Sequence, residues 1–243
     1  MTAARAALFA SGPFVTGADV SLDESAAHHL RVVRIDEGER LTLRDGLGST
    51  ADGVLTRLTK SRAVVTVDHV ASVPPPVPVH LLVPIADRER MLWLAEKAEE
   101  LNIASWRPVL WQRSRSVSPR GEGEAFQAKI RARMVAAMLQ SRSAWLPELC
   151  PDASPAQALA TLPEGPRVVL DAGGRPMVQV GLAATSAVTL AIGPEGGFDP
   201  AELVQLQEAG FSLCTLGASI LRFETAGVAA LAVVRSLLLS HAT

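Results

Sequence analysis

The stretch AVTLAIGPEGGFDPAE at residues 187–202 decides the fold of this chain. An apolar run rich in β-forming residues ends in a glycine loop at residues 193–197, and a helix start follows it. Asp199 suits the N-cap, Pro200 the first helical position and Glu202 the third position of a capping box. Strand, glycine loop and helix in this order predict an α/β protein that presents backbone amides to a ligand.

The glycine loop leaves two interpretations open. It has neither the GxGxxG pattern of dinucleotide sites nor the GxxxxGK[ST] pattern of triphosphate sites, so another small ligand is favoured. The alternative is a tight turn that needs glycine for its positive φ angles. Two more loops, DAGG at 171–174 and LGASILR at 216–222, also follow predicted strands. Because the loops after parallel strands gather at one sheet edge, the three together predict a small-molecule site.

Composition bounds the class of protein. The 243 residues suggest one large domain or two ordinary ones, and a hydrophobic content of 48% suffices for a sizeable core. No apolar segment is long enough to cross a bilayer, and the N-terminus lacks the apolar region of a secretory signal. With only Cys150 and Cys214, neither a disulfide framework nor a metal cluster is expected. We expect a cytoplasmic enzyme or binding protein.

The net charge of −2 conceals a basic segment. Residues 107–145 hold eight Lys and Arg against two acidic residues, whereas residues 151–243 hold four Arg against eight acidic residues. A basic patch favours the phosphate backbone of a nucleic acid. The alternative is a solvated face with ordinary ion pairs. Trp106, Trp111 and Trp145, in or beside this segment, are candidates for base stacking or for core packing.

The pattern of the chain changes at a stiff polyproline linker, residues 73–78. Residues 1–72 alternate as short strands separated by Asp-Gly turns, which predicts a small β-barrel. The following region alternates between the two kinds of element: strands at 79–85, 106–111, 167–171, 188–192 and 211–216, and helices at 88–102, 124–142, 200–208 and 224–240. This alternation predicts a mostly parallel sheet with helices on both faces.

The last helix opens with RFETA at residues 222–226. Arg222 lies beside a glycine-bearing loop, where its cation can orient a phosphate or a developing anion. The alternative is that Glu224 or Thr225 merely complements the helix N-terminus.

Four segments, in their observed order, resemble the RsmE family of bacterial 16S ribosomal RNA uridine-N3 methyltransferases: EKAEELNIASWRPVLWQRSRSV, MLQSRSAWLPEL, LAIGPEGGFDPAEL and LGASILRFETAGVAAL. HHLRVVRIDEGERLTLRDGLG looks like the entry to that family's barrel. The resemblance covers nearly the whole chain. It implies a PUA-like β-barrel at residues 1–72 and, at residues 79–243, a SPOUT-type methyltransferase domain with a deep trefoil knot. It also implies a homodimer, in which the apolar closing helix fits an interface as well as a core.

The activity implied by the resemblance is S-adenosylmethionine-dependent methylation of N3 of a U1498-type uridine in 16S rRNA of the 30S ribosomal subunit. The implied cofactor residues are Leu170, Asp171, Gly173, Ile192, Gly193, Pro194, Glu195, Gly196, Gly197, Leu216, Gly217, Ile220, Leu221, Arg222 and Thr225. The implied RNA-binding residues are His29, Arg31, Arg34, Arg113, Arg115 and Arg142.

The reaction itself suggests roles for two residues. Uridine N3 carries a proton at neutral pH, so the enzyme must remove it or stabilise the resulting anion. Arg222 is the candidate for the electrostatic role, and Glu224 is the candidate base or the group that orients Arg222. The N3 edge takes part in base pairing, so the target uridine must be unpaired or flipped out.

The chain departs from the family pattern at three places. Leu139 stands where the family has an acidic residue before QSxR, so no carboxylate is expected to act there. Residues 84–86 are Pro-Ile-Ala where the family often has Lys and Gly, and QRSRS at 112–116 lacks the family's Glu. Arg113 and Arg115 remain in that segment as basic candidates for RNA.

Three other functions remain open. A methyltransferase for another RNA would share every feature above. A non-enzymatic RNA-binding assembly factor needs the barrel and the basic segment but not three glycine-bearing loops. An enzyme that binds nucleotide phosphate at residues 193–197 would need a positive helix start, whereas Asp199 and Glu202 add negative charge there.

Overall fold

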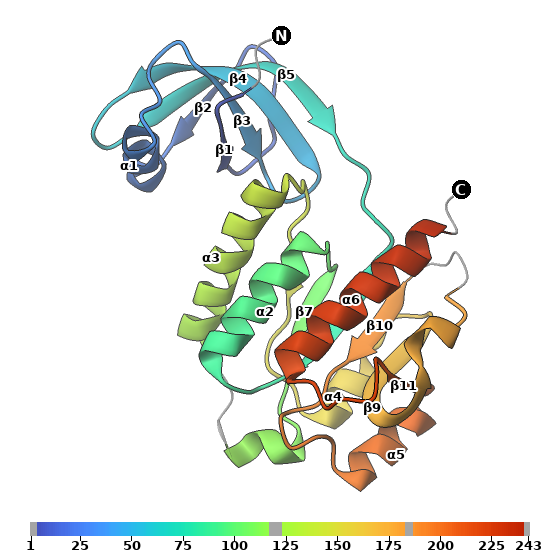
Figure 1. The fold of residues 1–243 in the computed structure, drawn as a ribbon. Helices are drawn as coiled ribbons and strands as arrows, with labels where there is room; N and C mark the ends of the chain where they lie inside the picture. Colours follow the sequence, from blue (N-terminus) through green and yellow to red (C-terminus); the bar gives the residue numbers. More distant parts are fainter. Residues whose placement is uncertain (1–3, 117–122, 183–186, 241–243) are drawn as a thin grey trace. The chain divides into compact units, whose positions relative to one another are not determined.

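The computed structural model describes residues 4–116, 123–182 and 187–240. The chain forms two compact units. The first, here called the barrel unit, comprises Met1–Pro75 and Met138–Leu146; the second, the α/β unit, comprises Pro76–Ala137 and Pro147–Thr243. Each unit contains a sheet of its own (Figure 1).

The barrel unit is built on a five-stranded sheet. Its strand order is β1 (Ala6–Phe9), β3 (Arg40–Arg44), β4 (Ser49–Leu58), β5 (Ala63–Ser72), β2 (Asp19–Leu22). β1 runs parallel to β3, and the other pairs are antiparallel. The alternating sequence predicts β3, β4 and β5, and buried positions alternate along β3 and over residues 51–55 of β4 and 63–67 of β5.

A helix in the barrel unit was not predicted from the strand pattern. α1 (Glu24–Val32) begins where the Asp23 carboxylate accepts a hydrogen bond of 2.9 Å from the backbone N–H of Ala26. Ala27 and Leu30 on this helix are fully buried in the core of the unit. The N-cap and these two buried residues therefore stabilise a helix of nine residues that is not evident from the sequence.

Trp145 packs on the barrel unit rather than offering a free face. A Cβ on Gly48 would lie 2.3 Å from the Trp145 ring, so the indole needs the glycine. Its Nε1 donates to the carbonyl of Val73 at 3.0 Å, and the backbone N–H of Gly48 donates to Ala144 at 2.9 Å. The ring is half-buried, and structural packing accounts for its contacts.

The α/β unit contains a six-stranded sheet in which all pairs are parallel. Its strand order is β11 (Phe211–Thr215), β9 (Arg167–Pro176), β10 (Val188–Ala191), β6 (Val79–Pro84), β7 (Ser105–Val109), β8 (Glu148–Leu149). β6 and β10 are the most apolar strands because both of their faces are covered. The predicted parallel sheet is confirmed.

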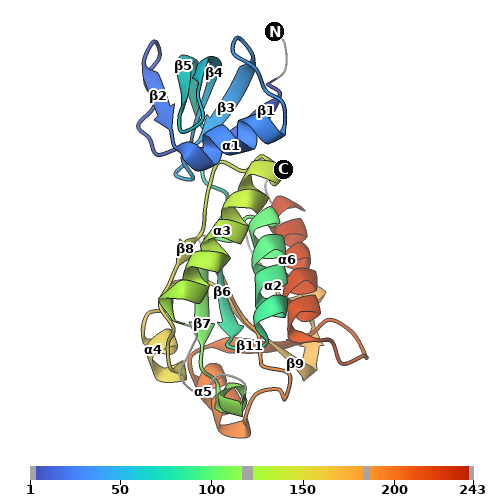
Figure 2. The ribbon, with the colours of Figure 1, turned by 90° about the vertical axis from the view of Figure 1, so that its left-hand side faces the viewer.

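Helices cover both faces of this sheet, as predicted (Figures 1 and 2). The helices are α2 (Arg88–Glu100), α3 (Glu124–Ser141) and α6 (Phe223–Ser240) on one face, with α4 (Pro155–Ala160) and α5 (Pro200–Glu208) on the other. Leu82 of β6 packs with Ala158 of α4 and Leu206 of α5. On the opposite face, Gly227 of α6 lies so close to Leu94 of α2 that a Cβ would approach to 2.8 Å.

The predicted capping box starts α5. Asp199 accepts a hydrogen bond of 3.0 Å from Ala201, and Glu202 accepts one of 2.9 Å from the backbone N–H of Asp199. The second oxygen of Glu202 accepts from the backbone N–H of Gln112 at 2.7 Å. Gln112 begins the 3-10 helix η1 (Gln112–Ser116) that follows β7. Glu202 therefore also fixes the start of η1, which follows β7; β7 is two strands away from β10 in the sheet.

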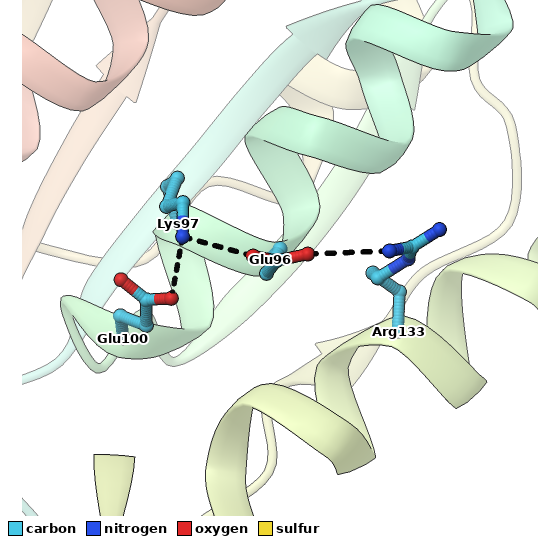
Figure 3. Close-up of polar contacts among 4 residues, drawn as sticks. All are labelled: Glu96, Lys97, Glu100 and Arg133. Carbon is cyan, nitrogen blue, oxygen red and sulfur yellow. Dashed lines mark hydrogen bonds and ion pairs between the residues drawn. The ribbon is translucent and has the colours of Figure 1, made fainter. Parts of the chain in front are cut away.

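Part of the basic segment is neutralised within the α/β unit (Figure 3). Lys97 bridges Glu96 at 2.8 Å and Glu100 at 2.7 Å, and Arg133 of α3 reaches the second oxygen of Glu96 at 3.4 Å. These side chains are partly exposed, so each pair contributes no more than about 1 kcal/mol. For Arg133, the interpretation as a solvated, ion-paired face is correct.

Two tryptophans in or beside the basic segment belong to the core. Trp106 and Trp111 are almost completely buried. The Trp111 ring contacts the Phe198 ring edge-on, with centroids 4.9 Å apart. Core packing, and not base stacking, is their role.

Arg235 of α6 holds the C-terminal end of α2 in place. Its guanidinium donates to the carbonyls of Leu101 at 2.8 Å, of Val77 at 2.6 Å, and of Asn102. Burial lowers the pKa of Arg235 to about 10, which still leaves it charged at neutral pH. The Arg235→Met substitution should lower the free energy of unfolding by about 2–4 kcal/mol, because carbonyls in a partly buried site lose a charged donor.

Urea unfolding followed by tryptophan fluorescence measures this effect. Arg133→Met is the matched control, since it removes an arginine whose ion pair is exposed, and it should cost less than about 1 kcal/mol. Equal losses in the two variants would show that the carbonyl contacts of Arg235 contribute nothing beyond its aliphatic stem.

Candidate functional site

The first of the three predicted loops is an excursion within β9. β11 pairs Leu213 with Val169 but Cys214 with Arg175, so residues 170–174, here called the β9 loop, leave the ladder. The chain returns at Gly174, where a Cβ would lie 2.4 Å from the backbone nitrogen of Cys214. Glycine is therefore required at this position by the neighbouring backbone.

A hollow of about 120 Å³ lies between the β9 loop and residues 216–222, the β11 loop. We call it the loop hollow. Six of the predicted cofactor residues line it: Leu170, Asp171, Leu216, Gly217, Ile220 and Leu221. β9 and β11 are neighbours in the sheet, so their adjacency brings the two loops together.

The wall of the loop hollow combines apolar side chains, open backbone and one carboxylate. A Cβ added to Gly217 would meet no atom within 4 Å, so this glycine borders open space. Leu216 and Leu221 supply apolar surface, and Asp171 supplies a carboxylate at the rim. Cys214 also lines the hollow; burial raises the pKa of its thiol, with Arg175 opposing the shift, so the thiol stays protonated and unreactive at neutral pH. The hollow can bind a small molecule but supplies no nucleophile through Cys214.

The β10 loop, residues 192–197, contains a tight turn. The backbone N–H of Gly197 donates to Pro194 at 2.7 Å, and Gly197 has a φ of 72°. The turn interpretation is thus correct for Gly197. The preceding residues Pro194, Glu195 and Gly196 line a second hollow of about 680 Å³. A turn and a binding wall therefore coexist in this loop.

We call the second hollow the arginine hollow, because two arginines line it. Arg90 comes from the first turn of α2, and Arg113 comes from η1. Arg90 forms an ion pair with Glu195, and Arg113 donates to the carbonyl of Gly196. The remaining lining residues are Ile85, Ala86, Asp87, Gln112 and Pro194.

Glu224 is paired with a lining residue of the arginine hollow. It lies in the first turn of α6, only 8% exposed, and its Oε1 is 3.9 Å from Nε of Arg90. Its other oxygen, Oε2, is buried and has no hydrogen-bond partner among the described residues. Ala226, two positions further along the helix, lines the loop hollow. A carboxylate with one uncommitted oxygen is thus paired with a lining residue of the arginine hollow, on the helix that also contributes Ala226 to the loop hollow. The N-terminal end of the helix stabilises its charge.

The structure separates the two predicted catalytic residues. Arg222 is exposed, and its carbonyl accepts the hydrogen bond of 2.8 Å from Ala226 that starts α6. In the described part of the chain, the ion-pair partner of Glu224 is Arg90 and not Arg222. Arg90 is not among the residues predicted from the sequence. Its position in the first turn after β6, at the same edge of the parallel sheet as the three loops, is the signal that would have found it.

Six other predicted cofactor residues line neither hollow: Gly173, Ile192, Gly193, Gly197, Arg222 and Thr225. Ile192 is buried in the core, and a Cβ on Gly193 would contact the Phe198 ring at 3.0 Å. The Gly173 N–H donates to the Asp171 carboxylate at 2.8 Å. These residues shape the loops that carry the lining residues.

Three predicted RNA-binding residues lie on or just after α1 in the barrel unit. His29 is exposed. Arg31 is committed in part to the unit itself, since its Nη2 donates to the carbonyl of Lys60 at 3.0 Å. Arg34 is exposed, with a φ of 57°, at the turn that follows the helix.

The other three predicted RNA-binding residues are divided between the units. Arg113 lines the arginine hollow, and the side chain of Arg115 lies outside the described residues. Arg142 lines a hollow of the barrel unit together with Arg40 and Arg44. Burial lowers the pKa of Arg44; the charge of Asp52 opposes this shift, and the charge of Arg142 adds to it. Clustered cations of this kind favour an anionic partner.

The described residues contain neither a candidate membrane span nor a candidate metal cluster. No helix there is long and apolar enough to cross a membrane. No three His, Cys, Asp or Glu side chains there converge as a metal site would require.

Known proteins match both parts of this chain. A family described as an RNA methyltransferase domain matches residues 73–235, and one described as an RNA methyltransferase PUA domain matches residues 22–68. The chain is 30% identical to the ribosomal RNA small subunit methyltransferase E of Mycobacterium bovis, over 90% of this chain and 87% of the relative. It is 26% identical to the protein of that name from Synechocystis, over 91% and 74% of the two chains.

Solved structures agree with these matches. The ribosomal RNA small subunit methyltransferase E of Neisseria gonorrhoeae, solved with S-adenosylmethionine, is 27% identical with a TM-score of 0.87, covering 96% of this chain and 97% of that one. A Legionella pneumophila methyltransferase solved with the same cofactor is 26% identical with a TM-score of 0.86, covering 95% and 96%.

The fold and the loop hollow, together with these matches, define an α/β RNA methyltransferase that carries a PUA domain. The chain belongs to the ribosomal RNA small subunit methyltransferase E family. The resemblance noted in the sequence is thereby confirmed, and so are the fold class and the enzyme class that it implied.

Proposed function

We propose that this protein transfers a methyl group from S-adenosylmethionine to N3 of one uridine in the 16S rRNA of the small ribosomal subunit. The observation that carries the proposal is the placement of Glu224. One oxygen of its carboxylate is buried without a partner among the described residues, and the other is paired with Arg90, which lines the arginine hollow. The helix that carries Glu224 also contributes Ala226 to the loop hollow. A methyl donor in the loop hollow and a base with an acidic N–H at the Glu224 carboxylate fit this arrangement.

The loop hollow has the residues to hold the cofactor. The β9 and β11 loops offer backbone groups and the apolar side chains of Leu216 and Leu221, and Gly217 leaves room for the ligand. The β10 loop supports them from the neighbouring strand. S-adenosylmethionine supplies a methyl group on a positively charged sulfur, and methyl transfer to N3 leaves that sulfur as a neutral thioether.

The chain must remove the N3 proton and tolerate the charge left behind. We assign the proton to the Glu224 carboxylate, which is fixed in the first turn of α6. The N3–H electron pair then forms the new N–C bond. Arg222, at the start of the same helix, offsets negative charge that develops on the uracil ring. Fixed placement by the loops supplies the proximity contribution.

The barrel unit is the proposed RNA-binding domain. Its hollow lined by Arg40, Arg44 and Arg142 suits phosphate, and residues 73–78 serve as the linker between RNA-binding and catalytic domains. We further propose a trefoil knot in the C-terminal loops, a cytoplasmic location and a homodimer. Ile220, 92% exposed on the β11 loop, is an apolar residue that a second subunit would cover, and sedimentation equilibrium measures that association.

Methyl transfer from labelled S-adenosylmethionine to small ribosomal subunits that lack the modification tests the proposed function. Mass spectrometry of the nucleosides should identify N3-methyluridine at one site. Transfer to another base, or to another RNA and not to the subunit, would overturn the proposed target. Binding of the cofactor without any transfer to RNA would support an assembly factor instead.

The Arg222→Ala variant tests the electrostatic role of Arg222. We expect the single-turnover rate to fall by roughly 10²-fold, the effect of losing one stabilising donor in an active site. The affinity for S-adenosylmethionine, measured by calorimetry, should stay within about threefold. An unchanged rate would remove Arg222 from the catalytic assignment.

A further inference from the structure

The methyl donor is assigned above to the loop hollow, and three of the predicted cofactor residues, Pro194, Glu195 and Gly196, line the arginine hollow instead. We infer that the arginine hollow is the binding site of the target uracil. In it, Arg90 and Arg113 donate hydrogen bonds to the two carbonyl oxygens of the ring. This inference rests on the proposed function, and it names the residues that recognise the base.

Arg90 and Arg113 come from different elements and contact the same turn, in the β10 loop. Arg90 follows β6 and contacts the side chain of Glu195, whereas Arg113 follows β7 and contacts the carbonyl of the next residue, Gly196. β6 and β7 are neighbouring parallel strands, so both arginines stand at their carboxyl edge. The β10 loop thus fixes two guanidinium groups at one cavity.

The size of the cavity fits a nucleobase with its ribose. The volume of about 680 Å³ lies within the range of small-molecule sites, roughly 300–1,000 Å³. A flipped-out base needs such a preformed cavity, since it gives up stacking and pairing to enter.

The charges of the lining favour a neutral ligand over a phosphate. Asp87 and Glu195 balance Arg90 and Arg113 within the lining. A balanced lining gains little from a ligand that is already anionic, but its arginines remain able to donate as charge develops. Uracil has this property, because it is neutral until N3 loses its proton.

The donor pattern also matches uracil. The base presents O4, N3–H and O2 in a row, and removal of the N3 proton spreads negative charge onto both oxygens. Guanidinium groups provide several N–H donors and remain charged at neutral pH. With Arg90 and Arg113 on the two oxygens, the N3–H between them is left for Glu224, whose Oε1 is 3.9 Å from Arg90. The proton moves to that carboxylate as N3 forms its bond to the methyl carbon.

The Arg90→Gln variant provides the central experiment. In single-turnover methyl transfer to small subunits, we expect a rate at least about 100-fold below that of the wild type at neutral pH. The pH–rate profile should shift to higher pH, because the unsupported N3 proton is harder to remove. Loss of the Arg90 charge beside Glu224 moves the profile in the same direction, so the acidity of the substrate is the readout that separates contact with the base from this ion pair. The affinity for S-adenosylhomocysteine should be unchanged.

The acidity of the substrate gives an independent readout. Small subunits reconstituted with 16S rRNA that contains 5-fluorouridine present a more acidic N3. They should recover at least about tenfold of the loss in Arg90→Gln while changing the wild-type rate much less. Arg90→Lys, which keeps a donor and its charge, should recover part of the rate and guards against a folding defect.

Arg88→Gln is the matched control. It removes the same charge from the same helix, but the Arg88 guanidinium lies over the Phe126 ring, 5.1 Å from its centroid. Its rate and pH profile should equal those of the wild type. An Arg90→Gln profile and fluorouridine response equal to those of the wild type would overturn this inference alone. Failure of the wild type to form N3-methyluridine would overturn the proposed function and this inference with it.

Discussion

Gly174→Ala should lower the free energy of unfolding by about 3 kcal/mol or more and reduce the melting temperature by roughly 6–12 °C. At this position the chain re-enters the β9–β11 ladder after the β9 loop. An added Cβ would lie 2.4 Å from the nitrogen and 2.6 Å from the Cα of Cys214. Both are backbone atoms of a paired strand, so no side-chain rotation can relieve the overlap, and the two strands must separate.

Differential scanning calorimetry measures this loss, and Gly173→Ala is the control. The neighbouring Gly173 has one close contact, 3.2 Å from a Cβ to the Asp171 carboxylate, which can turn aside. The control should lose less than about 1 kcal/mol. If both variants melt together with the wild type, the close approach of β9 and β11 is looser than described.

Gly217→Leu should leave the stability nearly unchanged but weaken the binding of the cofactor. A Cβ added there meets no described atom within 4 Å, so the new side chain can leave the backbone without overlap, and stability should change by less than about 1 kcal/mol. The side chain would stand in the loop hollow, where we place the cofactor. The affinity for S-adenosylmethionine should fall at least about 100-fold, equivalent to a loss of about 3 kcal/mol of binding free energy.

Isothermal titration calorimetry measures the affinity, and Gly181→Leu is the matched control. Gly181 is also exposed, with no atom within 4 Å of an added Cβ, but it lines neither hollow. The control should bind the cofactor as the wild type does. Wild-type affinity in Gly217→Leu would place the cofactor outside the loop hollow.

These two glycines show a limit of the sequence. Gly174 and Gly217 both occur in loops after predicted strands, and nothing in the local sequence distinguishes them. Gly174 is required because the backbone of Cys214, about 40 positions away in the sequence, lies against it. Gly217 borders a cavity, and an added Cβ there has no described atom within 4 Å.

Elements with a strong local signal were predicted well. The capping box of α5 and the buried strand β6 are set by adjacent residues, namely a cap and an unbroken apolar run. Elements with a weak signal were missed. α4 has six residues, too few for a helical period, and its capping box at Ser154 was overlooked.

The candidate site was predicted in part, and the reason is geometric. The GPEGG loop can be found from its motif, because the preference of glycine for turns is a local property of the sequence. Arg90 and Arg113 carry no motif of their own; they become a pair because β6 and β7 lie side by side and the β10 loop contacts both arginines.

The sequence by itself determined the parallel α/β class, the barrel strands, the loops that follow the C-terminal strands and the family. Periodicity, caps and turns act over a few residues, and the resemblance rests on contiguous motifs. The tertiary structure alone decided three things: that the β9 and β11 loops share one hollow, that residues 138–146 belong to the barrel unit, and that Arg90 is the ion-pair partner of Glu224. Strand order and chain return fix these contacts, and both depend on packing between residues far apart in the chain.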